Sequence, residues 1–143
     1  MRLVVDASVA LKWFVEEGDT ADALRLRTIH RLLAPDLLIA EVGNALSTKI
    51  RLGDMDADKA ELAAEALLGA GLDFRSATDL LLPALQVAMR LQHPAYDCFY
   101  LALALAEKCP LVTADQRFRH AVAARGDASE KAACLSLAEA VAR

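Results

Sequence analysis

Four acidic residues occupy positions where a carboxylate needs a partner. Glu41 lies in "LLIAEVGNA", a stretch from Leu37 to Ala45 that is apolar or small apart from Asn44. A charged group near an apolar surface loses hydration, so it is rarely left there without a partner. Three further acids raise the same question because each stands at the start or the end of an expected element: Asp6, Asp97 and Asp115.

Acids gathered at one place favour one kind of chemistry. Carboxylates brought together repel one another unless a cation lies between them. A ligand set made only of oxygen favours hard cations, Mg²⁺ or Mn²⁺, and Mg²⁺ keeps waters that a substrate phosphate can replace. The acids at positions 6, 41, 97 and 115 therefore fit metal-assisted attack on a phosphodiester better than an acid–base pair acting alone.

The elements that would position these acids alternate between strands and helices. Short apolar runs predict the strands "RLVVD", "LLAP", "LDFRSA", "PLVTAD" and "AACLS". Helices are expected from Ser8, as N-cap, to about Gly18, then over Thr20–Leu33, Asp36–Leu52, Asp56–Leu68, Thr78–Gln92, "YDCFYLALALAEK" and "QRFRHAVAA", and from Leu137 onward. This alternation predicts one α/β domain over residues 1–143, with a mostly parallel sheet between helices on both faces. Sites in such a sheet form beyond the carboxyl ends of the strands.

The helix that carries Glu41 places it beside an apolar stripe. The stripe is formed by Ile39, Val42, Leu46 and Ile50. Lys49 and Arg51 are poorly spaced for i,i+4 pairing with Glu41, so an exposed ion pair is disfavoured. Asn44, one turn on, is placed to orient the carboxylate or a water, and a plain surface position suits it nearly as well.

Composition and charge exclude several classes of protein. The chain is 56% hydrophobic, which excludes a disordered chain, and no uncharged apolar run approaches the roughly 20 residues of a membrane span. "MRLVVDAS" has an acid where a signal peptide is apolar, so we expect a cytoplasmic protein. The scattered cysteines predict buried free thiols, and the scattered histidines predict no metal site. The net charge of −4 argues against a nonspecific nucleic-acid binder, but not against a nuclease that holds metal.

Four fragments in order resemble one family: "VVDASVALKW", "AEVGNAL", "YDCFYLALA" and "LVTADQRF". They resemble PIN domains, and among these the VapC-type toxin ribonucleases, over essentially the whole chain. The family's acidic positions fall on the four acids without departure. The resemblance implies a Mg²⁺-dependent RNA endonuclease, with Mn²⁺ as a substitute ion, that forms a homodimer and is inhibited by a cognate antitoxin. It also implies that the hydroxyls of Ser8 and Thr113 assist the metal site; for Ser8 an N-cap role is equally compatible.

Within this resemblance the acids take different expected roles. Asp6 and Asp97 are the main expected metal ligands, Glu41 ligates directly or through water, and Asp115 completes the shell. Candidate guides for RNA are the basic residues near these acids: Lys12, Lys49, Arg51, Arg117 and Arg119. A solvated charged face explains each guide equally well. Trp13 and Phe14 have faces for base stacking, although such residues more often lie in a core or a dimer contact.

Other classes of protein fit less well. A phosphate receiver domain needs adjacent acids after the first strand and a lysine after a late strand, and this chain has neither. Dinucleotide binding needs a glycine-rich turn, which "DASVAL" does not offer. The remaining alternative is a catalytically silent PIN-like module that binds protein or RNA. The four intact acids argue against it, because a lost activity usually shows first at the ligands.

Overall fold

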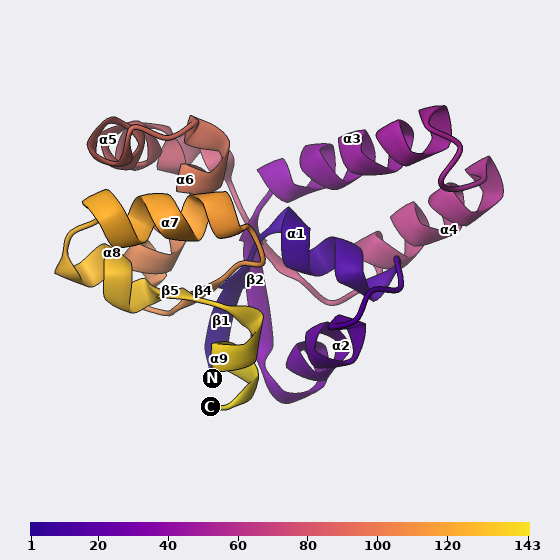
Figure 1. The fold of residues 1–143 in the computed structure, drawn as a ribbon, viewed down its shortest axis with the longest axis horizontal. Coiled ribbons are helices and arrows are strands. Elements are labelled where there is room, and N and C mark those ends of the chain that lie inside the picture. Colours follow the sequence, from indigo (N-terminus) through magenta and orange to yellow (C-terminus); the bar gives the residue numbers. More distant parts are fainter.

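A single sheet of five parallel strands crosses the middle of the molecule in the computed structural model, which describes residues 1–143 (Figure 1). The strand order is β3-β2-β1-β4-β5. The strands are β1 (Arg2–Val5), β2 (Arg31–Pro35), β3 (Asp73–Arg75), β4 (Leu111–Val112) and β5 (Cys134–Leu135). Leu3 of β1 is in register with Leu32 of β2, and Val5 is in register with Val112 of β4. The predicted parallel α/β architecture is confirmed.

Helices lie on both sides of this sheet. They are α1 (Ala7–Ala10), the 3₁₀ helix η1 (Leu11–Trp13), α2 (Thr20–Ile29), α3 (Leu37–Arg51), α4 (Ala57–Leu68), the 3₁₀ helix η2 (Ala77–Leu80), α5 (Leu81–Leu91), α6 (Ala95–Glu107), α7 (Gln116–Arg125), α8 (Ala128–Ala133) and α9 (Leu137–Val141). Figure 1 shows α1 to α4 on one side of the strands and α5 to α8 on the other. Helices α3 and α4 project from the sheet as an arm, and the two chain ends lie close together beside α9.

Helix α6 is the central helix of the fold, as its apolar sequence predicts. It contacts β1, β2, β4 and α5, and Tyr100, Leu101 and Leu103 are almost completely buried. An almost entirely apolar helix is stable only when it is covered on most sides. Burial fixes α6 over the sheet, so Asp97 in its first turn is held at the carboxyl edge of the strands.

Three elements differ from the predictions, among them the first helix, which ends at Trp13 and not near Gly18. Helix α2 ends at Ile29 and β2 begins at Arg31, so the predicted continuation of that helix to Leu33 is wrong. His30 is extended at the junction, without the glycine or proline that usually announces such a break. Helix α8 was not predicted; Asp127 caps it with a capping box to Glu130.

The arm exposes part of the predicted apolar stripe of α3. Val42 and Leu46 are buried together with Leu38, but Ile39 and Ile50 are 38% and 40% exposed. The buried line therefore runs at spacing i, i+4, i+8 from Leu38, and α3 packs chiefly against α4, α1 and β2. No helix in the structure has both the length and the apolar character to cross a bilayer.

The three cysteines are free thiols, as predicted, but the predicted burial is complete only for the first of them. Cys98 is completely buried, whereas Cys109 and Cys134 are half-buried. Burial raises the pKa of the Cys98 thiol to about 12, so it stays protonated at neutral pH. These side chains are packing residues in this fold.

Candidate active site

The winding of the sheet changes direction between β1 and β4. From β1 the chain passes to β2 and β3 on one side, and β4 and β5 extend the sheet on the other. In open parallel sheets, ligands bind in the crevice outside the strand ends at this point. Asp6 directly follows β1, and Thr113 directly follows β4, so the two residues face each other across the switch point.

Asp6 is the most enclosed of the four acids. It is only 4% exposed, and its Oδ1 accepts hydrogen bonds from Ser8 Oγ at 2.5 Å and from Val9 N at 3.2 Å. Its Oδ2 accepts a hydrogen bond from Thr113 Oγ1. Burial raises the pKa of Asp6 to about 6; the donors oppose this rise, and the charge of Asp97 adds to it. Asp6 is thus a carboxylate held in a costly charged state.

Asp6, and not Ser8, is the N-cap of α1. Its side chain accepts from Val9 N, so the predicted capping role of Ser8 is wrong. Both residue types cap helices, and the chain leaves β1 in extended conformation at Asp6, one turn before Val9. Ser8 Oγ instead accepts a hydrogen bond from Ala114 N at 2.9 Å. Ser8 and Thr113 therefore tie Asp6 to the end of β4.

Asp97 lies in the first turn of α6 but does not cap it. Its Oδ2 accepts a hydrogen bond from His93 Nε2 at 2.7 Å, and the N-cap residue is Pro94, which makes no side-chain cap. Burial raises the pKa of Asp97, the His93 hydrogen bond opposes the rise, and the charge of Asp115 adds to it. Asp97 is therefore held in place from outside its own helix, by the turn between α5 and α6.

Glu41 faces α6, which answers the question raised by its apolar surroundings. Tyr100 donates a hydrogen bond from its hydroxyl to Glu41 Oε1 at 2.6 Å. Burial raises the pKa of Glu41; Tyr100 opposes the rise, and the charge of Asp97 adds to it. Asn44 borders the same hollow but makes no side-chain hydrogen bond to Glu41. The predicted orienting role therefore belongs in this structure to Tyr100, which the sequence did not single out.

Asp115 is the N-cap of α7. Its Oδ1 accepts a hydrogen bond from Phe118 N at 3.1 Å, and its backbone N–H donates to Thr113 Oγ1 at 3.0 Å. Thr113 thus contacts both Asp6 and Asp115. The buried Thr113 hydroxyl, at the end of β4, therefore joins the end of β1 to the N-cap of α7.

The four acids are neighbours without a lysine or arginine partner. Asp97 is central, because its charge raises the pKa of both Asp6 and Glu41. The charge of Asp115 in turn raises the pKa of Asp97. No lysine or arginine forms an ion pair with any of them, and His93 is the one basic side chain in contact. Three carboxylate oxygens accept no hydrogen bond from the protein: Glu41 Oε2, Asp97 Oδ1 and Asp115 Oδ2.

The donor set fits a hard divalent cation in chemistry, but it is not a closed cage. Oxygen atoms from mutually repelling carboxylates are the ligands that such cations prefer. However, no three acidic, histidine or cysteine side chains converge at metal-ligand spacing. The structure therefore groups the four acids at the switch point, and their role as one ligand set stays a prediction.

Two hollows flank the acids. One cleft of about 570 Å³ is lined by Asp97 and Asp115 together with the α5–α6 turn and one face of α7. A second hollow, of about 400 Å³, lies beside Glu41 and is lined by Leu37, Ala40, Asn44 and Tyr96. The exposed ring of Tyr96 was not predicted as part of the site, although its place directly before Asp97 is a usable signal.

The predicted RNA guides do not all lie where that role requires. Lys12 is buried, and its Nζ pairs with Glu17 at 2.6 Å and Asp19 at 3.0 Å, so it is not available to a phosphate. Arg119 pairs with Glu139 at 3.5 Å and borders a different hollow. Lys49 and Arg51 lie in the last turn of α3, about 12 Å or more along the helix from Glu41. Arg117 lines the larger cleft beside Asp115.

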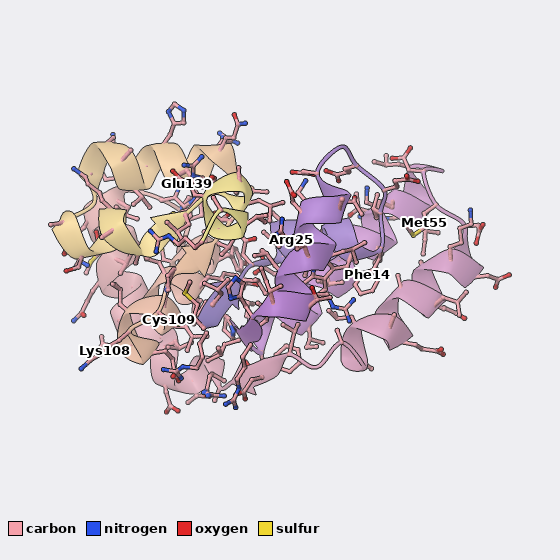
Figure 2. The ribbon with its side chains drawn as sticks, turned by 90° about the horizontal axis from the view of Figure 1, so that it is seen from below. Phe14, Arg25, Met55, Lys108, Cys109 and Glu139 are labelled. Carbon is pink, nitrogen blue, oxygen red and sulfur yellow. The ribbon has the colours of Figure 1, made fainter.

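Trp13 and Phe14 are not free for base stacking. Trp13 is 8% exposed, and its Nε1 donates to the carbonyl of Ala23 at 3.0 Å. Phe14 packs edge-on against Trp13 at 6.2 Å between ring centroids and lies inside the outline of the helices in Figure 2. The core reading of these aromatic residues is therefore the right one, and residues 12–14 form no exposed surface.

The fold and the site together define a class, a parallel α/β domain with uncompensated acids at its switch point. The PIN domain sequence pattern matches residues 3–123, and the chain belongs to the PIN domain family. No curated protein sequence gives a significant match.

Two solved structures share the fold. The crystal structure of PAE2754 from Pyrobaculum aerophilum superposes with a TM-score of 0.71 at 22% identity, covering 100% of this chain and 88% of that one. The structure of VapBC2 from Rickettsia felis, bound to a DNA fragment from their promoter, gives 0.63 at 13% identity, covering 84% of this chain and 92% of that one. At such low identities these likenesses show the fold.

Proposed function

We propose that this protein is a metal-dependent endoribonuclease that hydrolyses RNA phosphodiester bonds with Mg²⁺, or Mn²⁺ in its place, at the four acids. PIN domains are generally metal-dependent nucleases. One observation carries the proposal: the acids are gathered at the switch point, partly buried and repelling one another, with no lysine or arginine to neutralise them. A protein keeps such an arrangement at a cost in stability, which suits a site that receives a cation.

The residues of the site would have two kinds of role, holding the ion and fixing the carboxylates that hold it. Glu41, Asp97 and Asp115 would hold the ion through their unbonded oxygens, and Asp6 would hold it from the floor of the crevice. When bound, Mg²⁺ supplies positive charge beside the phosphoryl oxygens and makes a water more acidic. Thr113 and Ser8 fix the Asp6 carboxylate, and Tyr100 fixes that of Glu41, so the acids cannot turn freely away. Fixed ligands lower the reorganisation needed as charge develops in the transition state.

The alternative, a silent PIN-like binding module, is less well supported. A module without turnover gains nothing from buried carboxylates that repel one another. A binding surface for phosphate would be served better by basic groups at the switch point, and Asp6, Glu41, Asp97 and Asp115 occupy it instead.

The deciding experiment is RNA cleavage with and without the ion. Purified protein, free of any bound partner, is incubated with total RNA in Mg²⁺, in Mn²⁺ and in chelator, and the cut ends are mapped. We expect cleavage in both ions and only background in chelator, because all proposed ligands are oxygens. Full cleavage in chelator would overturn the metal-dependent mechanism. Intact RNA in both ions would favour the silent module.

We further infer that the protein is the toxin of a toxin–antitoxin pair that acts in the cytoplasm. The antitoxin would inhibit it by placing a lysine or arginine among the acids, which form no ion pair with a lysine or arginine of this chain and have only His93 as a basic contact. The structural likeness to VapBC2 supports the pairing at the level of the fold. A groove of about 300 Å³ between α3 and α4, lined by Leu46, Ile50 and Ala60 among others, offers an apolar seat for an antitoxin segment.

The proposed homodimer has a better surface than Trp13 and Phe14, which pack in the core. Helix α5 exposes four apolar side chains, each between 47% and 67% exposed: Leu81, Leu82, Leu85 and Met89. Exposed apolar side chains grouped on one helix mark contact surfaces. We expect light scattering at micromolar concentration to give a dimer, and Leu82→Asp with Met89→Asp to give a monomer. Leu62→Asp on α4, equally exposed, is the control and should leave the dimer intact. A monodisperse monomer of the wild-type protein would contradict the proposed dimer.

A further inference from the structure

The larger cleft beside the acids has a basic wall that no part of the proposed metal site uses. Arg117, His120 and Arg125 line it from α7, together with Ala121 and Ala124. These positions follow the spacing i, i+3, i+4, i+7, i+8, so they form one face of the helix. Two small alanines between the three basic groups leave that face hollow.

The three basic side chains are unpaired. Arg117, His120 and Arg125 make no ion pair and no side-chain hydrogen bond, and all three are exposed. Other arginines in the same half of the molecule are used within the fold: Arg90 pairs with the buried Glu130, and Arg119, on another face of α7, pairs with Glu139. An unpaired guanidinium in a concave surface is a ready partner for an anion.

The direction of α7 relates this basic wall to the acids. Asp115 caps the start of α7 at the rim, and Arg125 is its last residue. From residue 117 to residue 125 the helix rises about 12 Å, at 1.5 Å per residue. The cleft therefore begins at Asp97 and Asp115 and becomes basic along α7, away from the acids. Figure 1 shows α7 beside α5 and α6, and the turn that connects those two helices lines the other wall of the cleft.

The opposite wall adds polar groups. Gln92 and His93 line the cleft from the turn after α5. Gln92 is held in the left-handed region at φ 50°, where its backbone N–H donates to the carbonyl of Ala88. This conformation keeps an exposed amide side chain at the mouth of the cleft, on the wall facing α7. Polar groups on two walls suit a ligand that accepts hydrogen bonds on more than one side.

We propose that this cleft binds a backbone phosphate of single-stranded RNA next to the bond that is cut, with Arg117, His120 and Arg125 as its binding residues. The inference rests on the proposed RNA cleavage and deepens it, because it states on which side of the acids the chain of the substrate continues. Phosphate oxygens accept bidentate hydrogen bonds from guanidinium groups, and an imidazole N–H supplies a further donor. Contacts of this kind hold the strand without reading its sequence.

The test compares two charge-matched double variants. Arg117→Gln with Arg125→Gln removes two positive charges from the cleft. Arg25→Gln with Lys108→Gln removes two from exposed positions on α2 and after α6, elsewhere on the surface (Figure 2). Binding of a short fluorescein-labelled single-stranded RNA is followed by anisotropy in chelator, where the RNA stays uncut, over a range of salt concentrations. His120→Ala is measured in the same way.

We expect the cleft double variant to bind RNA at least about tenfold more weakly than wild type, with a dependence of log K on log salt that is shallower by about 0.7, the value for one lost phosphate contact on a single strand. His120→Ala should weaken RNA binding by less than the double variant does. The control double variant should bind RNA with an affinity within about twofold of wild type. In Mg²⁺ the cleft variant should raise the KM for RNA and leave kcat nearly unchanged, as expected for lost ground-state binding.

Three outcomes would overturn the proposal. The first is a cleft double variant that binds RNA as wild type does, and the second is wild-type protein that binds this RNA without salt dependence. The third is a cleft variant that loses only its affinity for an acidic partner protein, which would make the cleft a protein-docking site. The proposed cleavage fails separately: RNA that is bound through these residues but never cut in Mg²⁺ leaves the phosphate site standing.

Discussion

Glu41→Gln is expected to lower RNA cleavage at least about a hundredfold, the order found when a metal-ligand set is disturbed. The metal-free protein should meanwhile melt at the same temperature or higher. The amide oxygen of glutamine can still accept the hydrogen bond from the Tyr100 hydroxyl, so no buried donor loses its partner. The substitution removes only the charge, which burial and Asp97 disfavour.

Two further variants separate charge from structure at this position. Glu41→Leu leaves the buried Tyr100 hydroxyl without an acceptor and should cost about 1–3 kcal/mol of unfolding free energy. Glu65→Gln, on the exposed face of α4, is the charge-matched control and should change neither cleavage nor melting temperature. Cleavage of RNA in Mg²⁺ and thermal unfolding in chelator are measured for each. A Glu41→Gln protein that melts early but cuts RNA normally would show that Glu41 serves the fold.

The grouping of the four acids was predictable because it follows from the topology of a parallel sheet. Asp6 and Asp115 directly follow apolar runs that read as strands, and parallel strands end at one edge. Helix α6 is apolar almost all round, which predicts a central position and so places Asp97 at the same edge. Local sequence patterns therefore predict which acids lie at the carboxyl edge of the sheet, and the family resemblance names the same residues.

The family resemblance implied the hydroxyls of Ser8 and Thr113 at the site, but no rule of local sequence pairs Thr113 with Asp6 or finds Tyr100, because these partners come from distant parts of the chain. Tyr100 and Glu41 are 59 residues apart, and Thr113 and Asp6 are 107 apart. No periodicity links residues at such separations. Which hydroxyl meets which carboxylate is decided by the packing of α3 and α6 against the sheet. The orienting role was therefore assigned to Asn44, the polar neighbour one turn away, instead of to Tyr100.

The wrong prediction of Lys12 as an RNA guide has a physical cause as well. Lys12 was expected on a regular helix running to Gly18, but the helix tightens into the 3₁₀ turn η1 and ends at Trp13. The chain then folds back and brings Glu17 and Asp19 to the Lys12 ammonium group. The basic cleft on α7 was missed for the opposite reason. Its helical spacing is visible in the sequence, but the hollow it faces is made by a turn more than 20 residues earlier.

Asp6→Asn is expected to abolish measurable cleavage, again by at least about a hundredfold, and to stabilise the metal-free protein at neutral pH. The carboxyl has an ordinary pKa of 3.8 and a folded pKa of about 6. Between these two pH values the unfolded chain has released its proton while the folded protein keeps it. Stability is thus fully present below pH 3.8 and is lost as the pH rises through about 6. The free energy of unfolding falls by on the order of 3 kcal/mol at neutral pH, because each tenfold change in the acid dissociation constant corresponds to about 1.4 kcal/mol.

Asparagine keeps most of the local structure while it removes this titration. Its amide oxygen can cap α1 through Val9 N, and its NH₂ group can donate to Thr113 Oγ1. The variant should therefore melt close to wild type at about pH 4 and clearly above it at about pH 7.5, both in chelator. Asp54→Asn, in the exposed turn after α3, should follow wild type at both pH values. Since burial also raises the pKa of Glu41 and Asp97, part of the pH dependence should remain in the variant. If Asp6→Asn melts below wild type at both pH values, the hydrogen bonds of Asp6 outweigh its charge, and the acid is part of the framework more than a seat for a cation.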